Sequence, residues 1–295
     1  MTKMNNNSPV IIAEVGCNHK GNFDTAVEMI KIASSFCNVD IIKFQKRNIQ
    51  KLYTQDEYDK PHPNPENSYG ESYGKHREFL EFDIEQHLHL KKECEKYNKK
   101  YSSSVWDIIS AEDLVNINPS LIKVPSAINN NYEVLDFLFK NYKGEIHISL
   151  GMTTRDEEKK IIDLAIKRNM NKNLILYHCI SDYPVDISNL YLNEIIRLQE
   201  DYKNIIKAIG FSGHHKGISA DIAALAYGAK YFERHFTLDR TWKGTDHAAS
   251  LEPDGMRKLS RDLNSVCKAL RYKTTEIDET EKVQRAKLKY KNEKN

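Results

Sequence analysis

Two histidines and an aspartate in the last third of the chain have the types and order that a divalent metal site would use. His214 follows the apolar run 205–211, His235 follows the run 229–232, and Asp246 comes later in a glycine-containing loop. Ala, Leu and Ile at helical spacing separate the runs, which predicts a strand–helix–strand unit whose strand ends share one sheet edge. Converging imidazoles and a carboxylate suit a borderline divalent metal. Two unrelated histidines, one capping a helix and one in a core, are the alternative.

The apolar runs along the chain predict the elements that must position these side chains. Helical patterns alternate with eight strand candidates, at 9–15, 39–44, 100–104, 121–124, 145–149, 174–178, 205–212 and 231–235. This alternation of apolar runs is typical of a (β/α)8 TIM barrel, whose strands are buried on both faces. A doubly wound open sheet also alternates, but no GxGxxG opens a helix after the first run. We therefore expect an α/β fold with a single TIM-barrel domain over residues 1–272.

Two stretches depart from the alternation. Residues 48–75 contain three prolines, at 61, 63 and 65, so we expect an irregular loop there that could act as a lid. Residues 273–295 are charged and nearly free of large aliphatic side chains. We expect them to form a charged tail that is flexible or partly helical.

Composition limits the compartment and the partners. The 295 residues are 29% charged with a formal net charge of +2, which indicates neither a nucleic-acid nor a membrane partner. The chain has no apolar run long enough to span a membrane and no signal-peptide core at its start. Its five scattered cysteines lack a CxxC pair and favour free thiols. We expect a cytoplasmic protein.

Lysines and serines occupy the ends of the predicted strands, where the active site of a barrel lies. Lys43 and Lys123 fall within buried strands, which is unfavourable unless an anion pairs with them. With the nearby serines they predict a site for a phosphate or a carboxylate. Either lysine could instead reach solvent from its strand end. A Schiff-base nucleophile, as in class I aldolases, is a further alternative that would leave both histidines without a role.

Eight motifs in the chain resemble the sialic acid (N-acylneuraminate) synthase family. In the family's order they are IIAEVGCNHKG, IIKFQ, YGKHREFLEF, IKVPS, HCISDYP, GFSGHH, ERHFTLD and TWKGTDHAASLEP. The resemblance implies a transferase of carbohydrate biosynthesis that condenses phosphoenolpyruvate with a small acceptor sugar. The acceptor would be an open-chain N-acyl-mannosamine-type sugar or its 6-phosphate, and the products a nonulosonic acid and phosphate. The resemblance also implies a divalent metal, Mn²⁺ or Mg²⁺, and a homodimer.

The resemblance assigns roles to individual residues. His214 and His235 would bind the metal, while Glu14, Tyr183 and Asp246 would meet the sugar as the catalytic groups. Proton transfer needs a carboxyl group, which Glu14 or Asp246 could supply, although Asp246 could instead complete the metal shell. The residues that would hold phosphoenolpyruvate are Lys43, Gln45, Ser104, Lys123, Ser126, Ser149, Ser181 and Ser212.

Three features depart from the family pattern. The chain stops where family members usually continue into an antifreeze-like domain, whose arginine reaches the partner subunit's sugar site. Ile128 occupies a position that is usually acidic, and Leu150 replaces a serine or threonine. We therefore expect the reaction type to be kept, while the acceptor could be a different aldose that gives another 3-deoxy-ulosonic acid. A barrel that binds ligands without catalysis is the non-enzyme alternative.

Two further groups of residues have open roles. Cys17 lies near Glu14 and could be a metal ligand, although a thiol in the pocket wall is the simpler interpretation. Lys75, His76 and Arg77 could lie over the acceptor, on a phosphate, or could simply begin a solvated helix.

Overall fold

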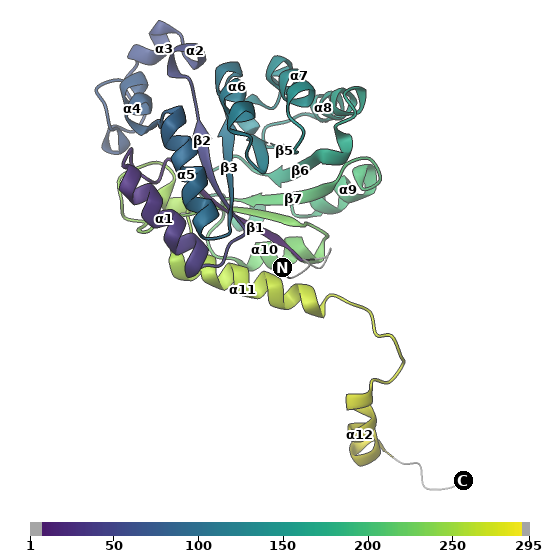
Figure 1. Ribbon diagram of the computed structural model, residues 1–295. Coiled ribbons are helices and arrows are strands. Elements are labelled where there is room, and N and C mark those ends of the chain that lie inside the picture. The colour runs from purple at the N-terminus through teal and green to yellow at the C-terminus, as the bar shows by residue number, and fades with distance from the viewer. Residues whose placement is uncertain (1–7, 291–295) are drawn as a thin grey trace.

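The computed structural model describes residues 8–290, and its centre is a closed barrel of parallel strands in sequence order (Figure 1). Each strand pairs with the next one along the chain, and β8 pairs with β1. The strands are β1 (Val10–Gly16), β2 (Ile41–Lys46), β3 (Lys100–Val105), β4 (Leu121–Val124), β5 (Glu145–Ser149), β6 (Leu174–Cys179), β7 (Ala208–Gly213) and β8 (Tyr231–His235).

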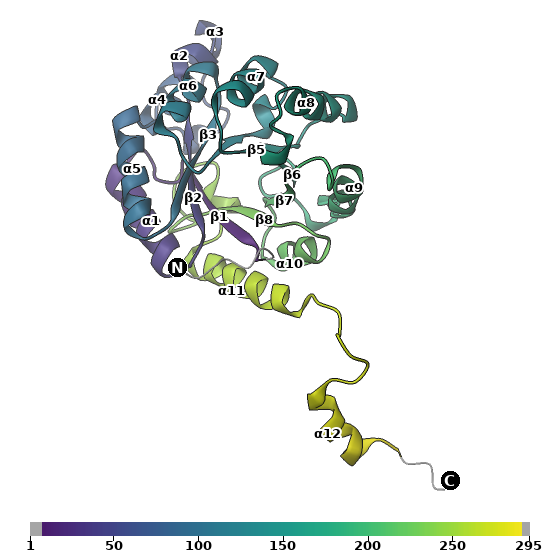
Figure 2. The same ribbon diagram turned by 45° about the vertical axis from the view of Figure 1, so that its right-hand side comes forward.

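A ring of helices surrounds the barrel (Figure 2). They are α1 (Phe23–Ser35), α5 (Ile84–Lys96), α6 (Ile108–Ile117), α7 (Tyr132–Asn141), α8 (Arg155–Lys167), α9 (Asn193–Tyr202), α10 (Ser219–Ala226) and α11 (Pro253–Ala269). Several begin at a polar residue whose side chain accepts a backbone N–H of the first turn, as Asn22 does for α1 and Asp83 for α5. The predicted (β/α)8 TIM barrel is confirmed.

The period of two along each strand separates two environments. On β2, Ile42 and Phe44 point outward into the main core between strands and helices. Ile41 points inward and joins a small apolar cluster at the amino-terminal end of the barrel with Ile12, Leu121, Ile175, Tyr177 and Tyr231. This inner layer closes the floor of the barrel, so the inward residues nearer the carboxyl ends of the strands form the walls of any cavity above it.

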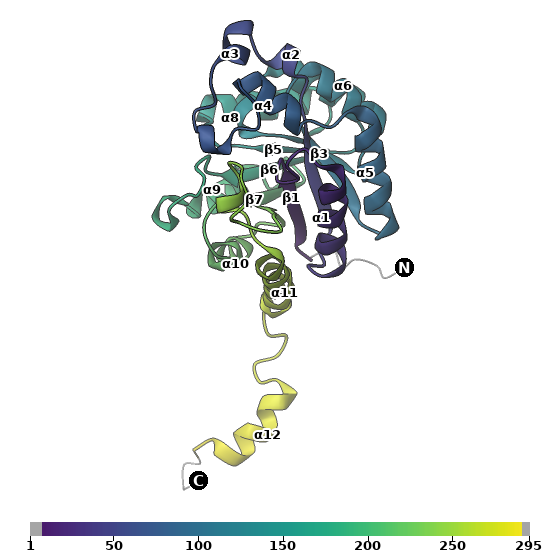
Figure 3. The same ribbon diagram turned by 90° about the vertical axis from the view of Figure 1, so that its left-hand side faces the viewer.

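The segment between β2 and α5 is more regular than the sequence analysis expected. It contains α2 (Ile49–Leu52), α3 (Gln55–Asp59), the 3-10 helix η1 (Pro65–Asn67) and α4 (Tyr73–Leu80). Figure 3 shows it projecting at one end of the barrel. The expectation of an irregular loop was wrong because polar caps start new helices around the prolines, at 48, 54, 64 and 72. Its action as a lid stays a prediction.

The chain beyond α11 leaves the barrel (Figure 1). Residues 270–276 are exposed, and α12 (Glu279–Leu288) follows them with no buried residue. The division of the chain at residue 272 stays a prediction. The remaining short elements are the 3-10 helices η2 (Ser126–Ile128), η3 (Asn171–Asn173), η4 (Ile187–Asn189) and η5 (His247–Ala249). Within residues 8–290, no helix has both the length and the apolar character needed to cross a membrane.

Candidate functional site

A cavity of about 300 Å³ opens at the carboxyl ends of the strands, and every strand contributes to its wall. All of the site residues predicted from the sequence line it, namely Glu14, Lys43, Gln45, Ser104, Lys123, Ser126, Ser149, Ser181, Tyr183, Ser212, His214, His235 and Asp246. The rest of the wall consists of Arg47, Arg77, Trp106, Pro125, Ala127, Met152, Cys179 and Glu233. The structure therefore brings the predicted residues together, while their roles stay predictions.

Both buried lysines are paired with carboxylates of the protein itself. The Nζ atom of Lys43 lies 2.7 Å from Glu14 Oε2 and 3.6 Å from Glu233 Oε1, and it donates to Ser104 Oγ at 2.7 Å. The Nζ atom of Lys123 lies 2.9 Å from Glu233 Oε2. The buried lysines therefore do not require a bound anion, because Glu14 and Glu233 already balance their charge.

The carboxylates affect the two lysines differently. Burial alone would lower the pKa of Lys43, but the charges of Glu14 and Glu233 raise it above its ordinary value. For Lys123 burial outweighs the charge of Glu233, and its pKa is lowered. Its Nζ also lies 3.7 Å from the centroid of the Tyr177 ring. Burial alone would raise the pKa of Glu233, but the charges of Lys123 and Lys43 hold it well below its usual range. The floor of the cavity is thus a network in which ammonium and carboxylate groups alternate.

Glu233 is the main residue that the sequence analysis missed. On β8 it alternates with Tyr231 and His235, so the period of two places all three inside the barrel. Arg234 between them points outward, where its Nη1 lies 2.6 Å from Asp221 Oδ2. The alternation in the motif ERHFTLD already places Glu233 on the same face of β8 as His235.

The two predicted metal ligands lie side by side. The ring centroids of His214 and His235 are 5.4 Å apart, and the Tyr183 ring lies 4.0 Å from that of His214. The backbone oxygen of Ile180 lies 2.9 Å from His214 Nδ1, which fixes the tautomer with a lone pair on Nε2. Burial and then the charge of His235 lower the pKa of His214 to about 3, so this imidazole is neutral, as a metal ligand must be.

The donor set fits a divalent metal with an open coordination shell. His235 Nδ1 is buried and has no hydrogen-bond partner among residues 8–290, although Asp246 Oδ2 lies 3.6 Å away. Within those residues, no group of three or more His, Cys, Asp or Glu side chains is arranged to hold a metal. His214 and His235 would supply the two imidazoles, and Asp246 or water and substrate oxygens would complete the shell. His215 faces away, with Nε2 3.2 Å from Asp221 Oδ2.

A second wall of the cavity is built around Gly16, at the irregularity in the pairing of β1 with β2. Gln45 Nε2 donates to Glu14 Oε1 at 2.6 Å. A Cβ on Gly16 would lie 3.1 Å from Gln45 Nε2, 3.3 Å from Glu14 Oε1 and 3.5 Å from Asp246 Oδ2, and its φ of +56° is left-handed. Glycine is therefore needed here to let these three polar side chains approach one another.

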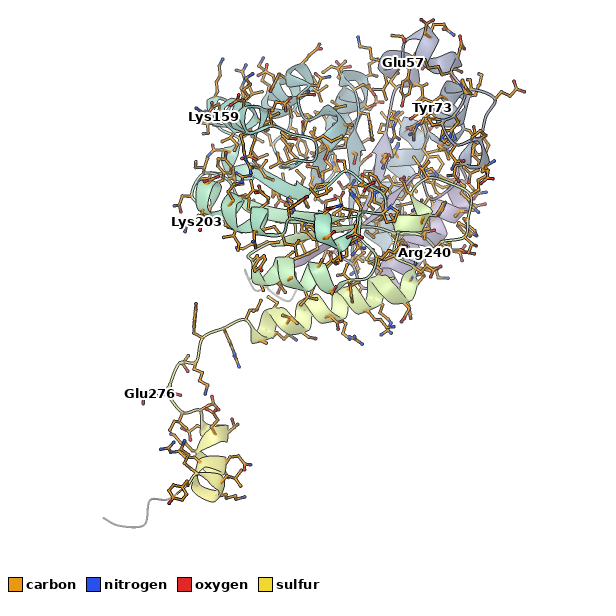
Figure 4. All side chains as sticks on the ribbon, turned by 180° about the vertical axis from the view of Figure 1, so that it is seen from behind. Glu57, Tyr73, Lys159, Lys203, Arg240 and Glu276 are labelled. Atoms are coloured by element: carbon orange, nitrogen blue, oxygen red, sulfur yellow. The ribbon has the colours of Figure 1, made fainter. Side chains whose placement is uncertain are left out.

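The loop that contains Asp246 is tied to the α2–α4 segment. The backbone N–H of Gly244 donates to Asn67 Oδ1 at 3.2 Å, and Lys243 Nζ lies 5.1 Å from the Tyr69 ring centroid. In Figure 4 the labelled Tyr73, on α4, lies on the same side of the molecule as Arg240, which belongs to the loop after β8. These contacts hold the residues before α4 against the loop that contains Asp246.

Of the residues whose roles were left open, only Arg77 lies in the wall of the cavity. On the same helix α4, Lys75 is exposed and forms an ion pair with Glu78 at 3.0 Å. His76 Nδ1 accepts a hydrogen bond from the backbone N–H of Tyr69. Cys17 does not line the cavity, and burial raises the pKa of its thiol. Neither Ile128 nor Leu150 lines it either.

Comparison with known proteins identifies the family. Residues 29–275 match the model of the NeuB family. The chain belongs to the NeuB family. Human N-acetylneuraminate-9-phosphate synthase is 36% identical over 267 residues, which cover 90% of this NeuB-family chain and 72% of the human protein. The N,N'-diacetyllegionaminic acid synthase of Campylobacter jejuni is 30% identical, covering 88% of this chain and 77% of its own.

A solved structure agrees with the assignment to the NeuB family. The N-acetylneuraminic acid synthetase of Leptospira borgpetersenii, in complex with citrate, superposes with a TM-score of 0.81 at 28% identity, covering 97% of this chain and 94% of the other. The resemblance seen in the motifs is thus confirmed. The NeuB-family protein is an enzyme, a phosphoenolpyruvate-dependent transferase of carbohydrate biosynthesis.

Proposed function

We propose that this enzyme condenses phosphoenolpyruvate with an open-chain N-acyl-mannosamine-type sugar, or its 6-phosphate. The products would be a nonulosonic acid and phosphate, with Mn²⁺ or Mg²⁺ as the cofactor. The observation that supports this most is the convergence of the His214–His235 pair and the Lys43–Lys123 pair on one cavity. Two of its relatives are synthases of N-acetylneuraminate 9-phosphate and of diacetyllegionaminic acid, which supports a nonulosonic acid as the product.

Phosphoenolpyruvate would bind over the floor of the cavity. Its carboxylate and phosphate would approach Lys43 and Lys123, whose ammonium groups are fixed by Glu14 and Glu233 and need no reorganisation. Ser104, Ser126, Ser149, Ser181 and Ser212 offer hydroxyl donors from five different strands or their loops. An anion placed there would gain charge-assisted hydrogen bonds in a site that is largely shielded from water.

The acceptor would bind between the histidine pair and the Gly16 wall. A divalent metal held by His214 and His235 would polarise the sugar aldehyde as a Lewis acid. The enol carbon of phosphoenolpyruvate then forms the new carbon–carbon bond, and water adds to C2 before phosphate leaves. Glu14 or Asp246 would accept a proton from the attacking water and pass it to the new alkoxide. Both side chains line the cavity, and Gly16 allows them to approach each other.

An acceptor screen tests the proposal. The protein is incubated with phosphoenolpyruvate, Mn²⁺ and each of N-acetylmannosamine, its 6-phosphate, the diacetamido sugar corresponding to legionaminic acid, and shorter aldose phosphates, and phosphate release is followed. We expect release with at least one six-carbon N-acyl sugar. Release only with a shorter aldose would support the alternative 3-deoxy-ulosonic acid product. No release with any acceptor would refute the proposal.

One observation keeps the Schiff-base alternative worth testing. The lowered pKa of Lys123 is a property that a nucleophilic lysine also needs. Borohydride trapping of substrate on Lys123, with phosphate release unaffected by EDTA, would support that route over the metal-dependent one. The homodimer and the cytoplasmic location stay predictions.

A further inference from the structure

Arg77 is a cation of the cavity wall without a carboxylate partner. It lies on α4 and is half-buried. Its Nε and Nη2 donate to the Tyr73 hydroxyl at 3.2 and 2.8 Å, and its guanidinium lies 5.1 Å from the centroid of the same ring. In the described part of the chain no carboxylate forms an ion pair with Arg77, and Nη1 has no hydrogen-bond partner. The remaining N–H groups are therefore available to a ligand.

Among residues 8–290, the neighbouring Arg47, unlike Arg77, has a carboxylate partner. Arg47 Nη1 forms an ion pair with Glu81 Oε1 at 2.8 Å, and its guanidinium lies 4.1 Å from the centroid of the Trp106 ring. It also donates to the side chain of Gln45. The charge of Arg47 is thus balanced within the protein, as those of Lys43 and Lys123 are. A second guanidinium beside it, without a counterion, makes a local positive potential that favours a bound anion.

The position of Arg77 is on the acceptor side of the cavity. Its charge acts on Arg47 and Cys17 and helps to lower the pKa of Asp246. The adjacent Arg47 donates to Gln45 of the Gly16 wall, and among residues 8–290 no hydrogen bond or ion pair joins Arg77 to Lys43, Lys123 or Glu233 on the floor. An acceptor whose aldehyde lies near the histidine pair would extend past Asp246 and Gln45 towards α4, so its far end would meet Arg77.

We propose that Arg77 binds the phosphate group of a phosphorylated acceptor sugar and thereby determines the specificity of the enzyme. This inference rests on the proposed condensation. The planar guanidinium can donate two parallel hydrogen bonds to a phosphate, and the Tyr73 hydroxyl holds it in place from the opposite edge. The carboxylate or phosphate of phosphoenolpyruvate offers the same chemistry, and the experiment separates the two sources.

The test compares wild type with Arg77→Gln and Arg77→Lys on two acceptors, N-acetylmannosamine and its 6-phosphate. We expect Arg77→Gln to raise KM for the 6-phosphate by about 10- to 100-fold, the loss expected for a charge-assisted pair. The KM for phosphoenolpyruvate should change by less than about threefold, and kcat/KM for the unphosphorylated sugar should fall at least tenfold less than kcat/KM for the 6-phosphate. Arg77→Lys should give a KM for the 6-phosphate between those of the wild type and Arg77→Gln, because lysine keeps the positive charge but cannot donate two parallel hydrogen bonds from one planar group.

The matched control is Lys75→Gln, on the same helix. It removes one positive charge from α4, but the side chain is exposed and does not line the cavity. It should leave both acceptors unchanged. Equal losses of kcat/KM on both acceptors in Arg77→Gln, or a raised KM for phosphoenolpyruvate alone, would overturn the assignment of Arg77.

A binding measurement separates failure of the inference from failure of the proposed reaction. N-acetylmannosamine 6-phosphate is titrated calorimetrically into folded wild-type and variant protein without phosphoenolpyruvate. If the wild type releases no phosphate with any acceptor, the condensation is refuted, but a phosphate-dependent affinity that Arg77→Gln abolishes still supports the subsite. Equal affinity of wild type for the sugar and its 6-phosphate refutes the subsite, whatever the activity.

Discussion

Lys123 and Glu233 form a buried ion pair across the barrel, with 2.9 Å between Nζ and Oε2, although 110 positions separate them in the sequence. Glu233 also lies 3.6 Å from the Nζ of Lys43 and 3.4 Å from the hydroxyl of Ser212. One carboxylate therefore holds the ammonium groups of β2 and β4 in place. Removing one partner of such a pair leaves an uncompensated buried charge, which is strongly destabilising.

Glu233→Gln is expected to lower the free energy of unfolding by about 3 kcal/mol. Because Lys123 would then lack an anion, while Lys43 keeps Glu14, phosphoenolpyruvate should raise the melting temperature of the variant more than that of the wild type. Urea denaturation and thermal melts with and without phosphoenolpyruvate measure both effects. Glu78→Gln is the control, since its surface pair with Lys75 should contribute less than about 1 kcal/mol. Equal stabilisation of variant and wild type by phosphoenolpyruvate would show that the lysines do not bind it.

Gly16 and Gly217 provide a matched pair of substitutions. Both have positive φ, +56° and +79°, but a Cβ on Gly217 would meet nothing within 4 Å, whereas one on Gly16 would press on Gln45 and Glu14. Each alanine variant should lose about 1 kcal/mol of stability from backbone strain. Only Gly16→Ala should also lower kcat/KM, by roughly 10- to 100-fold if reacting groups are displaced by a few tenths of an ångström. Steady-state phosphate release checks this, and similar activity in the two variants would contradict it.

The histidine pair predicts the response to metal removal. EDTA should abolish phosphate release, and added Mn²⁺ should restore it. His214→Gln and His235→Gln should each weaken Mn²⁺ binding, measured by electron paramagnetic resonance, by at least about 10-fold. His215→Gln is the control from the next position in the sequence, because His215 faces Asp221 rather than the cavity. Its Mn²⁺ binding is expressed per mole of folded protein and should match that of the wild type. Undiminished Mn²⁺ binding in the His214 and His235 variants would place the metal elsewhere.

His87 predicts how stability depends on pH away from the cavity. Its imidazole on α5 is buried, with Nδ1 2.7 Å from the Tyr101 hydroxyl. Burial first, and then the charges of Lys46 and His19, lower its pKa from 6.5 to about 3. As pH falls below 6.5, the unfolded chain binds a proton that the folded protein does not bind until near pH 3. The free energy of unfolding therefore decreases across this window, by about 1.4 kcal/mol per pH unit from this group.

His87→Asn keeps an acceptor for Tyr101 but removes the titration. The free energy of unfolding of this variant should depend less steeply on pH than that of the wild type, by about 1.4 kcal/mol per unit between roughly pH 6 and 4. Urea denaturation at several pH values measures the slopes. His89→Asn, on the exposed face of the same helix, is the control. Parallel slopes for His87→Asn and the wild type would contradict the prediction.

The sequence by itself determined the order of the elements and which strand ends share one edge of the barrel. Apolar runs of strand length, separated by helical patterns, leave few arrangements besides a barrel, and parallel strands with helical crossovers bring their carboxyl ends to one edge. The resemblance of the motifs then assigned Glu14 and Asp246 to one site, and both line the cavity. The information is local, because each run and each strand end is read within a few residues.

Only the tertiary structure decided how the charges are shared. Lys123 and Glu233 meet because the barrel closes, and no pattern near either residue specifies that distance. Likewise, three adjacent basic side chains on α4 are equivalent in the sequence, yet the rotation of the helix turns Arg77 into the cavity and Lys75 into solvent. Strand order follows from chain connectivity and hydrophobic period, whereas ion pairing depends on distances of a few ångströms between elements that are far apart in the chain.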